Sequence, residues 1–182
     1  VVLDADLAGS TKSAMAQKVA PERFFDVGIA EQNLIGVSAG LAASGYIPFA
    51  STFAMFATGR CWEQIRNSVA YPQLNVKVIG SHSGITVGED GCTHQAIEDI
   101  AIMRAITGLS VFSPCDQYET KAVIDYVASH DGPCYVRLGR SQVEDFFTAD
   151  TDFDVTKINV LRQGSQKIAV FATGLMVQSS MK

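Results

Sequence analysis

The chain has 182 residues, of which 47% are apolar and 18% are charged, and its formal net charge at pH 7 is -5. This composition is typical of a well-packed α/β core and excludes an intrinsically disordered chain. The negative charge gives no electrostatic reason to bind nucleic acid, and no apolar run reaches the roughly 18 residues of a membrane span.

The cysteine pattern indicates a reducing compartment. Cys61, Cys92, Cys115 and Cys134 are far apart and form no C-x-x-C pair, so they predict reduced thiols rather than a disulfide framework or a zinc site. We recognise no secretory signal peptide and expect a cytoplasmic protein. Because the chain opens directly on an apolar run without an initiating methionine, we also expect it to be a piece of a longer protein.

Short apolar runs alternate with helical stretches along most of the chain. The predicted strands are residues 1–3, 24–27, 47–50, 76–79, 111–113 and 134–138. The predicted helices are residues 12–18, 31–44, 56–70, 95–106 and 117–129. Because strands joined by helical crossovers pair in parallel, this order predicts a doubly wound, mostly parallel α/β sheet with helices on both faces.

The last part of the chain differs in composition from the rest. Residues 148–166 are rich in aspartate, glycine and serine and predict a linker that follows a domain at 1–147. The apolar run at 167–171 predicts a new strand, so we expect a second domain to start in residues 167–182.

Glu31 stands at the start of a predicted helix that is apolar or small on nearly every side. A helix of this kind belongs in an interior or an interface. Glu31 also follows a predicted strand at its carboxyl end, which is where ligands bind in open α/β sheets. An acid in a first helical turn also complements the helix dipole, so its position alone leaves both roles open.

Other polar and aromatic residues follow the predicted strands at the same edge of the sheet, which predicts a site for a polar substrate. They are Asp4, Asp6, Ser10, Phe53, Phe56, His82, Asp90, His94, Asp116, Arg137 and Arg140. Taken singly, each has a plainer explanation. Phe53 and Phe56 are spaced like a core pair, His82 can be a structural histidine, and Arg137 can pair with a core carboxylate.

A set of short motifs occurs in a characteristic order. They are GIAEQN at 28–33, PFASTFAMF at 48–56, QIR at 64–66, HSGITVGEDG at 82–91 and THQ at 93–95. Together they resemble the pyrimidine-binding domain of transketolase over about residues 1–145. The resemblance continues into residues 167–182, which it identifies as the start of a truncated transketolase C-terminal domain.

The resemblance implies a thiamine diphosphate site with Glu31 hydrogen-bonded to the aminopyrimidine ring of the cofactor. A carboxyl group that donates a proton there favours the imino tautomer, whose exocyclic nitrogen deprotonates the thiazolium carbon. This role needs a carboxyl group that keeps its proton near neutral pH, and burial favours the neutral form. By the same resemblance, Phe56 stacks on the pyrimidine, Phe53 lines the pocket and Asp6 lies near the thiazolium.

The resemblance also assigns the substrate contacts. Asp90 and His94 match groups that bind sugar hydroxyls, and His94 also matches a group that moves protons. Ser10, His82 and Arg137 match the contacts to the sugar phosphate, and all three side chains are suitable donors to phosphate oxygens. The implied reaction is transfer of a two-carbon ketol unit between sugar phosphates, as in the pentose phosphate pathway.

Some parts of the family pattern are absent from this sequence. No Gly-Asp-Gly followed by Asn occurs, so the residues that would hold Mg²⁺ and the diphosphate are expected on a partner domain or subunit, without which the chain is expected to be inactive. An arginine that commonly completes the phosphate site lies upstream of Val1, and Cys92 stands where proline is usual. The small residues of helix 36–43 suit close packing, so we expect a homodimer.

Two alternatives remain open. The first is another thiamine diphosphate enzyme, such as deoxyxylulose-phosphate synthase, which shares the Gly-Ile-Ala-Glu element. That family tends to have arginine where Phe56 stands and Asp-Arg in place of His82 and Ser83, which favours transketolase. The second is a non-catalytic module that only dimerises.

Overall fold

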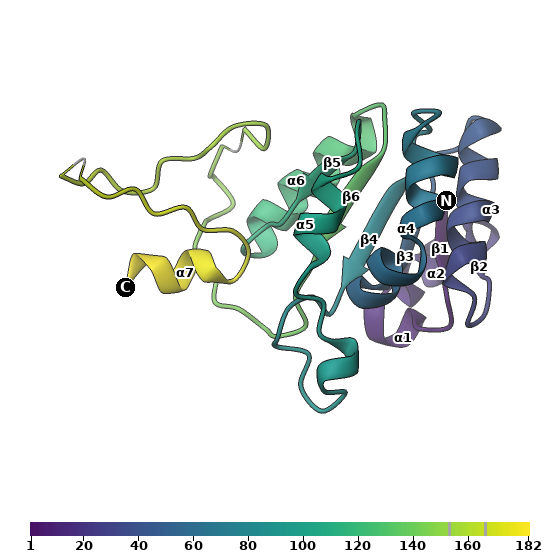
Figure 1. The fold of residues 1–182 in the computed structure, drawn as a ribbon, viewed down its shortest axis with the longest axis horizontal. Helices are drawn as coiled ribbons and strands as arrows, with labels where there is room; N and C mark the ends of the chain where they lie inside the picture. Colours follow the sequence, from purple (N-terminus) through teal and green to yellow (C-terminus); the bar gives the residue numbers. More distant parts are fainter. Residues whose placement is uncertain (153, 166) are drawn as a thin grey trace.

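A computed structural model describes residues 1–152, 154–165 and 167–182, and its centre is a single six-stranded sheet in the order β2-β1-β3-β4-β6-β5 (Figure 1). All neighbouring strands pair in parallel, which confirms the predicted fold class. The strands are β1 Val2–Asp4, β2 Phe24–Asp26, β3 Phe49–Phe53, β4 Lys77–Ser81, β5 Ser110–Phe112 and β6 Cys134–Arg137.

Helices of several kinds connect the strands. The α-helices are α1 Ala8–Thr11, α2 Ala14–Val19, α3 Glu31–Ala43, α4 Trp62–Gln64, α5 Asp99–Arg104, α6 Gln117–Ser129 and α7 Met176–Met181. The 3-10 helices are η1 Pro21–Arg23 and η4 Cys92–His94, and the π-helices are η2 Phe56–Arg60 and η3 Ile65–Ala70. The predicted helix at 56–70 therefore exists, but wider π-helical turns flank α4.

Two other predicted helices differ from the observed ones. The helix predicted at 12–18 begins later, at Ala14, because Lys12 adopts a left-handed conformation with φ 68° where the preceding short helix α1 ends. The helix predicted to begin at residue 95 begins at Asp99, since Gln95 is extended after the short helix η4.

The sheet buries a different apolar cluster on each face, because successive side chains of a strand point to opposite sides. Val78 and Tyr135 lie in the larger cluster, which α3, η3 and α5 cover. Val136 lies in the smaller one, against which α6 packs and Ile79 is partly buried. Leu34 of α3 is fully buried, and such a side chain contributes about 1.5–3 kcal/mol to stability.

Helix α6 begins with a well-formed cap. Asp116 Oδ1 accepts a hydrogen bond from the Glu119 amide at 2.9 Å, and Glu119 Oε2 accepts one from the Cys115 amide at 2.7 Å. The other oxygen of Asp116 accepts hydrogen bonds from the amides of Phe146 and Phe147, at 2.9 and 2.7 Å. One buried aspartate therefore starts α6 and also holds the chain where it leaves the sheet.

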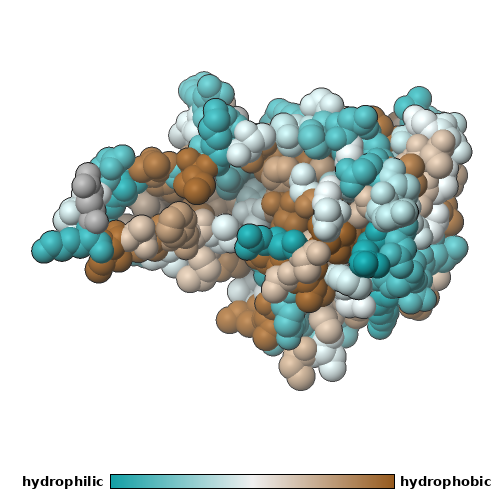
Figure 2. Space-filling model, turned by 45° about the horizontal axis from the view of Figure 1, so that its top comes forward, coloured by the Kyte–Doolittle hydropathy of each residue, from teal (hydrophilic) through white to brown (hydrophobic). Residues whose placement is uncertain are grey.

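Beyond this point the chain forms an arm that projects to the left in Figure 1 and carries α7 at its end. Apolar side chains gather on the arm (Figure 2), and Ile168, Val170 and Phe171 are all more than 70% exposed. The strand predicted at 167–171 does not form, because an isolated strand is unstable and nothing in the described chain pairs with it. Residues 153 and 166 of the predicted linker lie outside the described residues. No helix in the described part of the chain has the length and apolar character needed to cross a membrane.

Candidate active site at the carboxyl edge of the sheet

The strand order reverses between β1 and β3. The chain leaves β1 toward β2 on one side and leaves β3 toward β4 on the other, so the segments that follow these strands diverge. In parallel α/β sheets such a switch point is where ligands bind. The residues predicted to contact cofactor or substrate lie at the ends of β1, β2, β3 and β4 or in the segments that follow them, except Arg137, which ends β6.

Four rings meet at this edge. Phe53 ends β3 and Phe56 begins η2, and their rings stack with centroids 5.8 Å apart. The His82 ring lies on Phe53 at 4.0 Å, and His94 meets Phe56 edge-on at 5.1 Å. The structure therefore brings together aromatic and imidazole residues that are far apart in the sequence, in an arrangement suited to a planar heteroaromatic ring.

Glu31 is the first residue of α3 and is only 5% exposed. Its Oε1 accepts a hydrogen bond from Arg60 Nη1 at 2.7 Å. Arg60 ends η2, and its guanidinium carbon lies 4.2 Å from the centroid of the Phe56 ring. Glu31 and Phe56 are thus linked through one arginine that the sequence reasoning missed. The sequence feature that could have revealed this arginine is its spacing: it follows Phe56 by four residues, about one helical turn, which places both side chains on one face of a helix.

Cys61 lies next to this group and has no role as a nucleophile. Burial, together with the nearby Glu31 carboxylate, raises the pKa of its thiol to about 12, while Arg60 acts in the opposite direction. The thiol therefore stays neutral near pH 7 and packs as a small apolar group.

His82 follows β4 with a left-handed backbone, at φ 56°, and is 9% exposed. Its Nδ1 lies 3.1 Å from the Ser81 hydroxyl. Burial lowers the pKa of His82, and the positive charge of Arg140 lowers it further, against an opposing effect of Asp90. His82 is therefore a neutral imidazole near pH 7, able to donate or accept a hydrogen bond.

Asp90 and His94 lie on the loop between β4 and α5, where Asp90 is exposed. The His94 Nδ1 lies 2.9 Å from the Thr93 hydroxyl, which orients the ring toward Phe56. Arg140 reaches the same loop and pairs with Glu89 at 3.4 Å.

Asp6 and Ser10 lie on the segment after β1, and both are exposed. Asp4, which is fully buried, shapes this segment by accepting hydrogen bonds from the Leu7 amide and from the hydroxyls of Thr11 and Ser13, each at 2.7 Å. Asp6 adopts φ 61°, and its amide donates to Asp26 Oδ1 at 3.0 Å. The segment is thus held in a defined shape while its polar side chains stay accessible.

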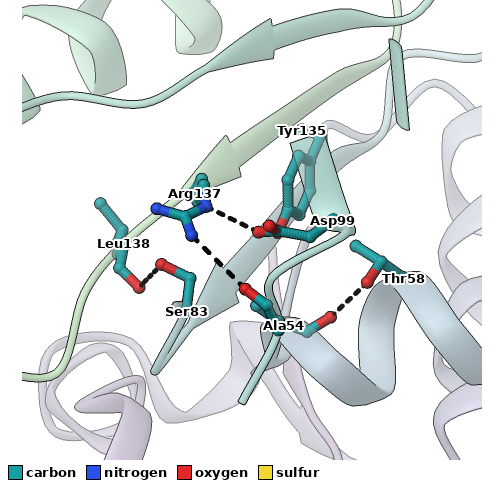
Figure 3. Close-up of polar contacts among 8 residues, drawn as sticks. Ala54, Thr58, Ser83, Asp99, Tyr135, Arg137 and Leu138 are labelled. Carbon is teal, nitrogen blue, oxygen red and sulfur yellow. Dashed lines mark hydrogen bonds and ion pairs between the residues drawn. The ribbon is translucent and has the colours of Figure 1, made fainter. Parts of the chain in front are cut away.

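Arg137 is placed differently from the prediction, because its side chain points into the protein (Figure 3). Its Nε donates to Asp99 Oδ2 at 2.7 Å, and its side chain is 17% exposed. Asp99 Oδ2 also accepts a hydrogen bond from the Tyr135 hydroxyl at 3.0 Å. This placement fits the alternative that Arg137 pairs with a core carboxylate. Arg140 is the arginine exposed at the edge.

The end of β6 closes the base of the loop that carries Asp90 and His94. Ser83 donates through both its amide and its hydroxyl to the Leu138 carbonyl, at 3.0 and 2.9 Å (Figure 3). Arg137 Nη2 donates to the Ala96 carbonyl at 3.4 Å, and the Gly84 amide donates to the same carbonyl at 2.9 Å. Both ends of the loop are therefore fixed to one strand.

Among the described residues no cluster of histidine, cysteine, aspartate and glutamate side chains could hold a metal ion. An aminopyrimidine, in contrast, fits the residues present. The planar Arg60 guanidinium lies on the Phe56 face while donating to Glu31, so one flat group contacts both side chains at once.

The chain matches the family described as "Transketolase, pyrimidine binding domain" over residues 1–145. It is 53% identical over its whole length to the "Putative transketolase C-terminal section" of Methanocaldococcus jannaschii and covers 58% of that protein. It is 42% identical to "6-deoxy-6-sulfo-D-fructose transketolase subunit SqwH" of Clostridium sp. (strain MSTE9) and covers 56% of that chain.

A solved structure described as "Split gene transketolase, inactive beta4 tetramer" superposes on the whole chain with a TM-score of 0.88 and 49% identity, over 58% of its own length. The chain thus spans a little over half the length of these three relatives. The family match covers all six strands of the sheet and all of the clustered site residues, and the chain belongs to the transketolase family as a carrier of its pyrimidine-binding domain.

Proposed function

We propose that this chain supplies the pyrimidine half of a thiamine diphosphate site, in an enzyme that transfers a two-carbon ketol unit between sugar phosphates. The observation that carries the proposal is the buried Glu31 carboxyl group, which the Arg60 guanidinium joins to the face of the Phe56 ring. Thiamine diphosphate, when bound, supplies the carbon nucleophile that breaks and forms the carbon–carbon bonds.

The residues of this chain bind and orient the pyrimidine ring. Phe56 offers its face for stacking, and Phe53 supports Phe56 from behind through the stacked pair. Glu31 holds a proton at the ring nitrogen, and Asp6 lies toward the thiazolium side. Diphosphate and Mg²⁺ would be held by a partner domain or subunit, since the sequence has no Gly-Asp-Gly followed by Asn.

The sugar substrate is held at the same edge. Asp90 and His94 bind the hydroxyls next to the reacting carbon, and His94 also transfers protons there. Ser10 and His82 bind the phosphate with Arg140, which takes the place first assigned to Arg137. Two observations support Arg140 as the phosphate contact instead of Arg137: Arg140 is exposed, and its positive charge lowers the pKa of the nearby His82.

The chain works with a partner subunit in this proposal. Relatives of similar extent are described as a section or a subunit of transketolases, and one solved relative is described as an inactive β-chain tetramer. Gly36, Gly40 and Ala43 form an exposed small-residue face on α3 that suits packing against a second copy. Residues 1–147 form the pyrimidine domain, residues 148–166 the linker and the remainder the start of the C-terminal domain of a cytoplasmic enzyme.

The test measures ketol transfer by the full-length subunit assembled with the subunit that carries the diphosphate-binding domain. The Glu31→Ala variant is expected to lose activity by at least about 100-fold, because it removes a proton-holding group from the site. Glu63→Ala is the matched control, since Glu63 is an exposed glutamate on the neighbouring helix α4.

Full activity of Glu31→Ala would overturn the role given to Glu31. Calorimetry separates the remaining alternatives. Binding of thiamine diphosphate only after the partner is added supports the shared site, whereas no binding under either condition supports a dimerising module. A panel of donor and acceptor sugars then identifies the substrate pair, which includes sulfonated sugars because one relative is named for such a substrate.

A further inference from the structure

Arg60 contacts both of the groups that the proposed cofactor needs. Its guanidinium lies 4.2 Å above the Phe56 ring and donates to Glu31 at 2.7 Å. A pyrimidine that stacks on Phe56 and bonds to Glu31 needs the same ring face and the same carboxyl group. A guanidinium and an aminopyrimidine are both planar, but the guanidinium donates to Glu31, whereas the pyrimidine ring nitrogen accepts from it.

The two partners need opposite hydrogen-bonding roles of Glu31. Toward Arg60, the Glu31 carboxylate oxygen accepts a hydrogen bond from the guanidinium. The proposed role at the pyrimidine ring requires the neutral carboxyl group, which donates a proton instead of accepting one. Glu31 therefore cannot hold Arg60 and perform this role at the same time.

We propose that Arg60 is a further residue of the cofactor site, which competes with the pyrimidine ring for Glu31 and Phe56 and leaves both when the ring binds. This inference rests on the function proposed above. With Arg60 in place, the buried Glu31 has a counter-ion, and the apolar face of Phe56 is covered. Arg60 thus lowers the affinity of the site for its cofactor.

The surroundings of Arg60 allow its side chain to move. The side chain is 52% exposed, so it has water to turn into. Its main chain is held separately, because Gln32 Nε2 donates to the Arg60 carbonyl at 3.0 Å. The guanidinium can therefore swing away while η2 and α3 keep their positions.

The experiment measures the Kd of thiamine diphosphate by calorimetry, in the presence of Mg²⁺, on the full-length subunit assembled with its diphosphate-domain partner. Arg60→Ala is expected to bind the cofactor about fivefold to tenfold more tightly than the unaltered complex, since the ion pair between the half-exposed Arg60 and the buried Glu31 and the cation–π contact no longer compete. Arg66→Ala is the matched control. Arg66 lies 5.9 Å from the Trp62 ring on the same helical stretch, and no change in Kd is expected.

The conservative variant sharpens the test. Arg60→Lys keeps a cation for Glu31 but has no planar face for Phe56, so its Kd is expected between those of the unaltered protein and Arg60→Ala. Binding by Arg60→Lys that is tighter than by Arg60→Ala would contradict the competition.

The outcomes separate this inference from the proposed function. If the unaltered complex binds the cofactor and Arg60→Ala binds it equally or more weakly, Arg60 does not compete and the inference fails while the function stands. If neither complex binds the cofactor, the proposed function fails and the inference fails with it.

Discussion

Arg137 and Asp99 form a buried ion pair, in which Nε lies 2.7 Å from the carboxylate oxygen at the base of the loop that carries Asp90 and His94. The Asp99 side chain is 1% exposed, and its second oxygen has no partner among the described residues. A buried carboxylate with so few partners depends strongly on the one cation that it has. The pair therefore holds the start of α5, and with it the loop, against the end of β6.

Replacing Arg137 by alanine is expected to lower the free energy of unfolding by about 3–5 kcal/mol, because it leaves the charge of Asp99 buried and unpaired. Urea denaturation followed by circular dichroism measures this loss. Arg104→Ala removes an exposed arginine from α5 and is expected to change stability by no more than about 0.5 kcal/mol. A loss below about 1 kcal/mol for Arg137→Ala would mean that Asp99 finds another partner.

Arg140→Ala is expected to raise the KM for phosphorylated sugars by about tenfold or more, because it removes a charged donor to the phosphate. The KM for sugars without a phosphate is expected to stay the same, and this comparison is the internal control. Steady-state kinetics of the assembled enzyme measure both. An equal rise for both classes of sugar would argue against a phosphate contact and favour a general effect on the site.

Gly80 is required because Tyr135 crosses it closely. A Cβ at position 80 would lie 2.6 Å from the Tyr135 hydroxyl and 2.7 Å from its Cε2. Gly80→Ala is therefore expected to destabilise the protein by about 1–3 kcal/mol through overpacking.

Tyr135→Phe alone is expected to cost stability, because the buried Asp99 Oδ2 loses the hydrogen bond from the Tyr135 hydroxyl. Combined with Gly80→Ala, it is expected to cost less than the sum of the two single changes, because the hydroxyl no longer meets the new Cβ while the ring-carbon contact remains. A double-mutant cycle of unfolding free energies measures the coupling between the two positions. If the two changes in unfolding free energy simply add, the Cβ at position 80 does not press on the Tyr135 hydroxyl, and the prediction is wrong.

His82 is expected to make folding pH-dependent. Its pKa in the folded protein is lowered, first by burial and then by Arg140. As the pH falls, the unfolded chain therefore binds a proton at His82 before the folded chain does. The contribution of His82 to stability is therefore present above the usual histidine pKa of about 6.5 and is lost as the pH falls below it.

Unfolding free energies of the unaltered protein and of His82→Asn, measured from pH 8 to pH 5, are expected to differ in slope below about pH 6.5. Titration by NMR gives a second measurement, in which Arg140→Ala should bring the pKa of His82 nearer its usual value. A pKa of His82 at or above about 6.5 in the unaltered protein would contradict the prediction.

The sequence predicted all six strands and the parallel sheet, because each strand is a short apolar run of its own and the runs alternate with helices. It placed the end of β3 too early, at residue 50, since Ser51 and Thr52 are polar. These residues stay in the strand because β4 pairs with them. Pairing with a neighbouring strand is a tertiary effect that local composition does not reveal.

Two arginines mark the limit of sequence reasoning at the site. Arg137 was expected at the phosphate, but it pairs with Asp99, 38 residues earlier in the chain. Arg60 was overlooked, although it contacts Glu31, 29 residues away. A long flexible side chain reaches several possible partners, and only the fold decides which of them lies within reach.

At residues 167–171 the sequence predicted a strand that the structure does not contain. The composition of this run favours a strand, yet Ile168, Val170 and Phe171 are exposed and pair with no strand of the described chain. Strand propensity acts only where a neighbour offers backbone partners.

Asp116 joins the start of α6 to the segment where the chain leaves the sheet. One oxygen secures the first turn of α6, and the other secures the amides of Phe146 and Phe147, where the chain departs from the sheet. The arm is held a second time where it returns, because the Gly174 amide donates to the Ser113 carbonyl at 3.0 Å, just after β5. A pull on the arm is therefore shared between the loop after β5 and the bonds to Asp116, and none of these bonds involves the rings around Phe56.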